Sequence, residues 1–282
     1  MPMPPDPVAF TLPFLDREVY WYGIMITVGT LAAAYVADRE AKRRGQNPDH
    51  VWNALILMMI LGLLGARLYH VFSLPANVDP AVRREYFENP VSIIAFWKGG
   101  LRGLGIYGAI AGALVGLWLY TKALKLSFAQ WCDFAALGAP LGQAIGRWGN
   151  WFNQELYGTP TRLPWGTPIS DENRLPQFQG LPPEARFHPT FLYESLWNLL
   201  AFFVLMFIAD RWSDRLRKGD LALMYLVLYP IGRYLVELQR PDAWTAGGVP
   251  VAQMFAVAAI VAASLWLLFR HGVHHLLAGA RA

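Results

Sequence analysis

Seven apolar stretches, each close to 20 residues long, set the strongest limit on how this chain of 282 residues can fold. A helix needs about 20 mostly apolar residues to cross the hydrocarbon core of a bilayer. The stretches occupy residues 19–37, 51–73, 103–121, 128–146, 190–209, 220–238 and 250–269. They predict an all-α integral membrane protein, a single polytopic domain over residues 1–282 with seven transmembrane helices.

The composition supports this class and argues against two others. Hydrophobic residues make up 55% of the chain and charged residues 16%, against about 25% charged in a soluble domain. The isoelectric point is near 9.2, but no run of five or more Lys or Arg occurs, so we expect no nucleic-acid partner. The single Cys132 lies in an apolar stretch and excludes an internal disulfide framework and a thiolate metal cluster. We expect neither a metal nor a cofactor.

Local signals mark helix starts and helix packing. Asn47-Pro48 predicts an N-cap followed by a proline at the first helical position, and residues 127–130 have the spacing of a capping box. Glycines recur four residues apart, which allows two helix backbones to approach closely. This spacing is found at Gly108, Gly112 and Gly116, and again at Gly138, Gly142 and Gly146.

The basic residues between the stretches predict the orientation. With the N-terminus outside, twelve Lys and Arg fall in short cytoplasmic segments, and ten are spread over outer segments of more than twice that length. The higher density marks the cytoplasmic side, so we expect the N-terminus outside and the C-terminus in the cytoplasm. The outer face then holds segments 74–102 and 147–189. Seven prolines in 159–189 exclude a continuous helix there, and we expect an ordered arm on the outer membrane surface.

Six of the predicted helices bring unusual polar residues to one level, the outer ends of the spans. These residues are Tyr22, Arg67, Tyr107, Arg147, His188 and Arg233, with Glu237 four residues after Arg233. An arginine at mid-membrane costs about 2.5–3.5 kcal/mol, which Glu237 offsets in part. Salt bridges that lock helices are one interpretation. Because Glu237 alone cannot neutralise both Arg147 and Arg233, we favour a second: the arginines bind an anion, and at this depth the abundant anion is a lipid phosphate.

One stretch, Gly146 to Gly158, reads GRWGNWFNQELYG and joins the fourth span to the arm. Its Asn150, Asn153 and Glu155 flank Arg147 within two helical turns. They can end the helix by satisfying its last carbonyls. They can also hold a glycerol hydroxyl and fix the arginine, with the glycines allowing close backbone approach.

This stretch resembles the signature of the bacterial prolipoprotein diacylglyceryl transferases. Further blocks of the family occur in the same order along nearly the whole chain. They are Trp21-Tyr22-Gly23, Gly65-Ala66-Arg67-Leu68, Asp133-Phe134, His188-Pro189 with Leu192-Tyr193-Glu194, Gly232-Arg233 with Val236-Glu237, and Arg240-Pro241-Asp242.

The resemblance implies a transferase of the bacterial cytoplasmic (inner) membrane whose site faces the outer leaflet. Such enzymes move the diacylglyceryl group of phosphatidylglycerol onto the lipobox cysteine of a preprolipoprotein signal peptide, forming a thioether and releasing glycerol phosphate. The partners implied are this lipid, these signal peptides and the bilayer. We expect catalysis to involve Arg147, Arg233, Tyr107 and His188. We expect the lipid to bind Arg147, Arg233, Asn150, Asn153, Glu155, Tyr22, Arg67 and Glu237.

The sequence departs from the family at one position. Many members have a histidine, proposed as general base, in a glycine-rich block before the third span; here residues 99–108 form a slightly longer block with Tyr107 at that place. Tyrosine, with a pKa near 10, is a poor base, whereas histidine, near 6.5, suits the task, so His188 is a second candidate. We expect electrostatic stabilisation of the leaving phosphate by the arginines to matter more than proton removal.

Two other functions are compatible with polar residues in a membrane. A secondary transporter or channel for an anionic solute also uses intramembrane arginines, but its charges lie at the midplane, and this chain has no visible inverted repeat. A lipid-binding scaffold without chemistry does not need such a density of amides, carboxylates and cations.

Overall fold

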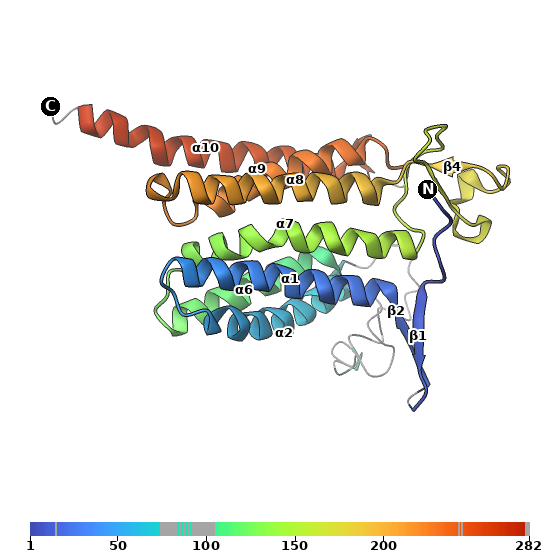
Figure 1. Ribbon diagram of the computed structural model, residues 1–282, viewed down its shortest axis with the longest axis horizontal. Helices are drawn as coiled ribbons and strands as arrows, with labels where there is room; N and C mark the ends of the chain where they lie inside the picture. The colour runs from blue at the N-terminus through green and yellow to red at the C-terminus, as the bar shows by residue number, and fades with distance from the viewer. Residues whose placement is uncertain are drawn as a thin grey trace. The chain divides into compact units, whose positions relative to one another are not determined.

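The computed structural model describes residues 1–14, 16–73, 84, 86, 88, 89, 91, 105–241, 243 and 245–279. Seven long helices dominate these residues, and each coincides with one predicted apolar stretch (Figure 1). They are α1 (Trp21–Arg43), α2 (Asp49–Phe72), α6 (Ile106–Ala123), α7 (Phe128–Phe152), α8 (Thr190–Arg211), α9 (Asp220–Glu237) and α10 (Val251–Gly279). The predicted helical class is confirmed. The predicted outer segment 74–102 lies almost wholly outside the described residues.

Four of these helices are long and apolar enough to cross a membrane, as judged by length and composition. They are α2, α6, α8 and the part of α10 from Val251 to Gly272. This finding supports a multi-pass membrane protein. The full set of seven spans and the orientation of the termini stay predictions.

The chain forms two compact units, one from Asp38 to Trp131 and one from Met1–Ala37 with Cys132–Ala282. In the Asp38–Trp131 unit α2 packs on α6 through glycines. A Cβ at Gly112 would overlap the backbone of Leu61, and a Cβ at Gly116 would come 3.0 Å from Met58 Cα. The predicted role of the glycine spacing is therefore confirmed.

The start of α2 differs by one residue from the prediction. The helix begins at Asp49, so Pro48 is the N-cap residue rather than the first helical residue. Asn47 still caps this end, because its Oδ1 accepts the backbone N–H of Asp49 at 3.0 Å. A proline without an N–H can stand at either place, since the first amides of a helix have no partner within it.

In the larger unit α1 packs on α7 in the same way, with a Cβ at Gly29 coming 2.5 Å from the carbonyl oxygen of Gly142. Helices α7, α8 and α9 share a buried core formed by Leu137, Leu205, Ala209 and Leu221. Because every helix of this core contributes fully buried side chains, the helices are held at fixed mutual positions.

Asp133 explains part of the Asp133-Phe134 block, at the start of α7. Its carboxylate accepts the backbone N–H groups of Gly219 at 2.6 Å and of Ala222 at 2.9 Å, and thereby caps the N-terminus of α9. Asp220, fully buried, binds Arg270 at 2.9 Å and His271 at 2.8 Å. These contacts tie α7, α9 and α10 together at one end of the unit.

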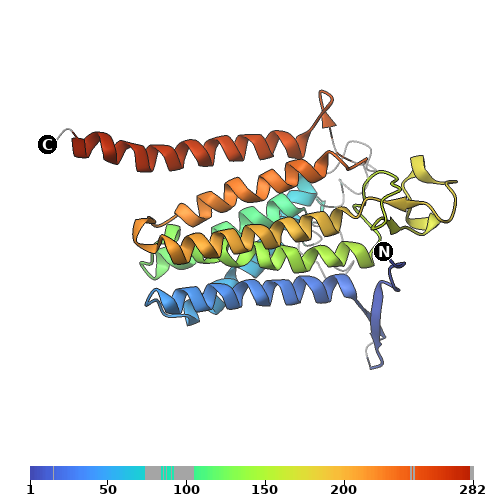
Figure 2. The same cartoon turned by 45° about the horizontal axis from the view of Figure 1, so that its top comes forward.

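The opposite end carries the short elements. An antiparallel hairpin of β1 (Val8–Leu12) and β2 (Arg17–Tyr20) leads into α1. The arm, residues 159–189, contains η1 (Asp171–Asn173), η2 (Pro176–Phe178) and the pair β3 (Thr167–Pro168) and β4 (Arg186–Phe187). The short pair β5 (Thr245–Ala246) and β6 (Val249–Pro250) follows α9 at this end, whereas η3 (Ser213–Arg215) joins α8 to α9 at the end that carries Asp220. Figures 1 and 2 place the hairpin and the arm at the end where α7 stops and α8 begins.

Candidate functional site

The helix α7 runs two turns beyond its predicted end at residue 146 and stops at Phe152. Arg147 and Asn150 therefore lie on a helix, where a spacing of three residues brings their side chains together. Arg147 donates from Nη1 to the Oδ1 atom of Asn150 at 3.4 Å. Asn150 in turn donates to the Oε1 atom of Glu155 at 2.8 Å, and Asn153 donates to the same oxygen at 3.3 Å.

The turn after α7 is strained at two residues. Gln154 and Leu156 have φ values of 53° and 55°, in the left-handed region that non-glycine residues seldom adopt. Contacts with other elements hold both in place: the backbone N–H of Ser170 donates to the side chain of Gln154 at 2.7 Å, and the Thr190 hydroxyl donates to the carbonyl of Leu156. The left-handed conformations on either side of Glu155 let its carboxylate reach back to Asn150 in α7.

Glu194, in the second turn of α8, joins the two arginines at the centre of the site. Its Oε2 lies 2.6 Å from Nε of Arg147, and its Oε1 lies 2.8 Å from Nη1 of Arg233. The Glu194 side chain is 7% exposed, against 22% and 17% for the two arginines. A buried carboxylate thus sits between two guanidinium groups that keep part of their surface accessible.

Neighbours of Glu194 fix α8 between the helices that carry the arginines. The Ser195 hydroxyl donates to the carbonyl of Ala144 in α7 at 2.9 Å, and the Trp197 indole donates to the carbonyl of Leu228 in α9 at 2.8 Å. Gly232 is needed beside this indole, because a Cβ there would overlap the Trp197 ring.

Glu237 extends the network along α9. It forms an ion pair with Arg233, as the spacing of four residues predicts, and its Oε2 lies 3.8 Å from Nη1 of Arg240. The sequence argument assigned a single carboxylate, Glu237, to the two arginines. The structure adds a second carboxylate, because Glu194 contacts both Arg147 and Arg233. The arginines are held by carboxylates, and anion binding would use the N–H groups that these contacts leave over.

Glu194 appeared in the sequence only as part of a family block and was not predicted as a site residue. It is the sole charged residue in the apolar stretch 190–209. Ionisable residues within apolar spans are costly and pair with one another, so the sequence alone could have indicated Glu194 as a site residue.

Tyr22 packs against the signature stretch from the first turn of α1. A Cβ at Gly149 would come 2.7 Å from the Cδ2 atom of the Tyr22 ring. The group that lies close to the backbone at Gly149 is the Tyr22 ring, and the approach of a lipid headgroup to the glycines stays a prediction. With 38% of its surface exposed, Tyr22 lies at the accessible side of the network.

His188 precedes α8 and makes contacts of two kinds. Its backbone N–H donates to Thr159 at 3.0 Å, and its carbonyl accepts the N–H of Gly158 at 2.9 Å, which anchors the end of the signature stretch. Its Nδ1 lies 3.1 Å from the hydroxyl of Tyr193, which also accepts the indole N–H of Trp165 at 3.1 Å. The backbone contacts are structural, and a catalytic role for the ring stays a prediction.

Arg67 and Tyr107 belong to the Asp38–Trp131 unit and are placed only within it. Arg67 donates to the Tyr86 hydroxyl at 3.3 Å and stands over the same ring, 5.2 Å from its centroid. Tyr107, in the first turn of α6, packs against Tyr69 and is 44% exposed. The residues of the glycine-rich block before 105 lie outside the described residues. The participation of Arg67 and Tyr107 in the site stays a prediction.

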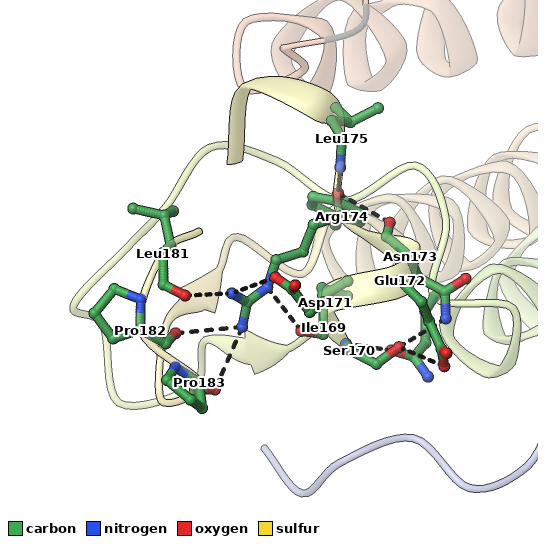
Figure 3. A network of polar contacts seen from close by, with 12 residues as sticks. Ile169, Ser170, Asp171, Glu172, Asn173, Arg174, Leu175, Leu181, Pro182 and Pro183 are labelled. Atoms are coloured by element: carbon green, nitrogen blue, oxygen red, sulfur yellow. Dashed lines mark hydrogen bonds and ion pairs between the residues drawn. The ribbon is translucent and has the colours of Figure 1, made fainter. Parts of the chain in front are cut away.

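The arm folds around a buried arginine (Figure 3). Arg174 donates to the carbonyls of Ile169 at 3.0 Å and Leu181 at 2.8 Å, and pairs with Asp171 at 3.3 Å. Its side chain is 2% exposed. Neither carbonyl belongs to a strand, so the Arg174 guanidinium supplies the hydrogen-bond donors that a neighbouring strand would otherwise provide.

An apolar cluster of Tyr157, Ile169 and Phe187 completes the arm. The Tyr157 hydroxyl accepts the backbone N–H of Leu175 at 2.5 Å. Because Tyr157 is part of the signature stretch, the cluster fixes the arm to the end of α7. In the described part of the chain, no three His, Cys, Asp or Glu side chains gather so that they could hold a metal ion.

Comparison with known proteins covers nearly all of these residues. The family model described as prolipoprotein diacylglyceryl transferase matches residues 7–269. Three proteins named phosphatidylglycerol–prolipoprotein diacylglyceryl transferase are similar to the chain. That of Chloroflexus aggregans is 41% identical over 95% of this chain and 91% of its own length, and that of Gloeobacter violaceus is 39% identical over 89% of each. That of Frankia casuarinae is 41% identical over 78% of this chain, which spans half of that longer protein.

Proposed function

Since the chain belongs to the prolipoprotein diacylglyceryl transferase family, we propose that it transfers the diacylglyceryl group of phosphatidylglycerol to a cysteine thiol of a prolipoprotein. The cysteine sulfur attacks the carbon of the diacylated glycerol that is bonded to a phosphate oxygen. A carbon–sulfur bond forms, the bond from that carbon to the phosphate oxygen breaks, and glycerol phosphate leaves with the bonding electrons. The thiol proton passes to a base or to the departing phosphate.

One observation carries this proposal: Glu194 holds Arg147 and Arg233 in one accessible cluster at the end of the helices. The phosphodiester of phosphatidylglycerol bears one negative charge, and a further charge develops on it as the carbon–oxygen bond breaks. Guanidinium groups fixed beforehand stabilise that charge without reorganising. The arginines therefore bind the phosphate and act as the main catalytic groups.

The amides and the carboxylate after α7 provide the other part of the lipid site. Asn150 and Asn153 are both bound to Glu155, which is itself exposed. Such a set offers both donors and acceptors to the hydroxyls of the glycerol headgroup. Tyr22 closes this side of the site, and Arg67 and Glu237 complete the lipid-binding set in our proposal.

Proton removal is the less demanding step. A free cysteine has a pKa near 8.5, and neighbouring arginines favour its thiolate. His188 and Tyr107 stay the two candidate bases. In this proposal either one contributes less to the rate than the arginines do.

The proposal includes the placement of the protein in the membrane. Seven spans put the N-terminus outside the bacterial inner membrane and the C-terminus in the cytoplasm. The phosphate site then opens to the outer leaflet, where a translocated signal peptide presents its lipobox cysteine. Four sufficiently apolar helices and the density of basic residues support this placement.

The family does not favour the alternative of a transporter or channel for an anionic solute. One experiment separates the two functions. Purified protein is mixed with phosphatidylglycerol vesicles and a lipobox peptide, and the peptide mass is measured. A gain of one diacylglyceryl group, with glycerol phosphate released, supports transfer. An unchanged peptide together with anion uptake into the vesicles would contradict it, and phosphatidylcholine vesicles serve as the control lipid.

A further inference from the structure

The N-terminal hairpin exposes large apolar side chains at its free end. Phe10 is 53% exposed, Leu12 38%, and Phe14, in the turn between the strands, 98%. A two-stranded hairpin is marginally stable by itself in water, and contiguous exposed apolar groups mark an interaction surface. This hairpin therefore needs something to cover it.

The register of the strands places Phe10 and Leu12 on one face, and Phe14 follows them in the turn. Phe10 pairs with Val19, and Leu12 pairs with Arg17. Side chains that stand opposite each other in an antiparallel pair share a face. This face is apolar, with a single cation near the turn whose long side chain can cover apolar surface and still reach a polar layer.

The other face is polar. Thr11 pairs with Glu18, and the hydroxyl of Tyr20 donates to the Oε2 atom of Glu18 at 2.5 Å. Both Thr11 and Glu18 are exposed. The hairpin is thus amphipathic, with a face for an apolar medium and a face for water.

The position of the hairpin at the start of α1 indicates what covers its apolar face. Strand β2 passes directly into α1, and the N–H of Trp21 donates to the carbonyl of Pro7 at 3.0 Å, so the base of the hairpin is fixed to the helix start. Figures 1 and 2 show the hairpin running across the direction of α1. Helix α1, which spans the membrane in the proposed placement, exposes Ile26, Leu31 and Tyr35. A hairpin that lies across the end of such a helix lies along the membrane surface.

The backbone limits its depth. In the described part of the chain this sheet has two strands, and open sheet edges do not occur in contact with lipid in the hydrocarbon interior. The hydrated boundary between headgroups and acyl chains does tolerate them, and aromatic residues such as Tyr20 and Trp21 are common there.

We propose that the hairpin from Val8 to Tyr20 is an interfacial anchor, with Phe10, Leu12 and Phe14 in the boundary between headgroups and acyl chains and Thr11 and Glu18 in water. The inference rests on the geometry of the hairpin and on the proposed placement of α1 across the membrane, and it is independent of the transfer reaction. It fixes the level of α1, and therefore of Tyr22, against the lipid surface.

Spin labels on the two faces test the proposal. The single cysteine is replaced by Cys132→Ala, or by Cys132→Ser if that protein is less soluble, and one new cysteine is introduced as Phe14→Cys or Thr11→Cys. The full-length labelled proteins are placed in nanodiscs of phosphatidylglycerol and phosphatidylethanolamine. Relaxation of each label by oxygen, which concentrates in lipid, is compared with relaxation by a water-soluble nickel chelate.

We expect the ratio of oxygen to nickel relaxation to favour oxygen at position 14 and nickel at position 11. Both substitutions replace exposed residues, so neither disturbs a packed core. A label at position 14 that nickel relaxes as strongly as the label at position 11 would place the hairpin in water and overturn the proposal. Exclusion of both reagents from position 14 would also overturn it, because the apolar face would then be covered by protein.

Discussion

The Oε2 atom of Glu194 lies 2.6 Å from the Nε atom of Arg147, so an ion pair joins the start of α8 to the end of α7. Its other oxygen binds Arg233 of α9 at 2.8 Å. Removing one partner of a buried ion pair leaves an uncompensated charge, at a cost of about 3–5 kcal/mol. The three helix ends therefore form one unit, and the spacing of the two guanidinium groups is set by a residue that need not touch the lipid.

Glu194→Gln keeps the size of the side chain and removes its charge. We expect kcat/KM for phosphatidylglycerol to fall by about 100-fold, because the two guanidinium groups repel and lose their fixed spacing. We also expect a lower melting temperature. Asp214→Asn, at an exposed carboxylate beyond the other end of α8, is the control and should change neither quantity. Normal kinetics with Gln at position 194 would show that the bridge does not organise the site.

Two glycines of the signature stretch give a matched pair. Gly149→Ala should displace Tyr22, since a Cβ there would come 2.7 Å from its ring, and transfer should fall by about tenfold or more. Gly146→Ala meets Ile26 at an ordinary 3.4 Å, so it should leave transfer unchanged and add up to about 1 kcal/mol from helix propensity. Transfer assays and thermal unfolding check both. Equal activity of the two variants would contradict the proposed role of Tyr22.

Proton removal can be separated from phosphate stabilisation by substitution at the two candidate bases. A general base contributes about 10²–10⁴-fold to a rate. On our account His188→Gln and Tyr107→Phe each lower kcat by less than about tenfold across the pH range, because the arginines favour the thiolate. A loss of 100-fold or more, confined to one variant, would identify that residue as an essential base.

Arg174→Ala should unfold the arm while leaving the helices intact. The substitution leaves buried carbonyls without a donor, and each such hydrogen bond to a charged group contributes about 1.5–3 kcal/mol. Limited proteolysis should then cut within residues 159–189, whereas the control Arg162→Ala, at an exposed position, should resist cleavage as the wild type does. An equally resistant Arg174→Ala protein would show that the guanidinium is dispensable.

The helices could be predicted because a span leaves a long uniform signal. The end of α7 was predicted six residues early, since Gly, Trp and Asn at 146–152 resemble a loop in composition although they continue the helix. Eight residues of the predicted site lie in the larger unit: Tyr22, Arg147, Asn150, Asn153, Glu155, His188, Arg233 and Glu237. It leaves Arg67 and Tyr107 in the other unit.

What the sequence left open was pairing between distant segments. Nothing in a local pattern says that Glu194 reaches two helices at once, or that the cation Arg174 is buried among carbonyls rather than exposed on a proline-rich loop. Such contacts depend on side-chain directions that only the packed helices define. The resemblance to a family supplied the chemistry, and the structure supplied the connections between its residues.

The most direct test of the arginine site is transfer by Arg147→Ala and Arg233→Ala in phosphatidylglycerol vesicles, followed by the mass of a lipobox peptide. Membrane insertion and thermal unfolding are measured on the same samples. We predict that both proteins insert and that neither adds a diacylglyceryl group at a measurable rate. Near-normal transfer by either variant would contradict the account.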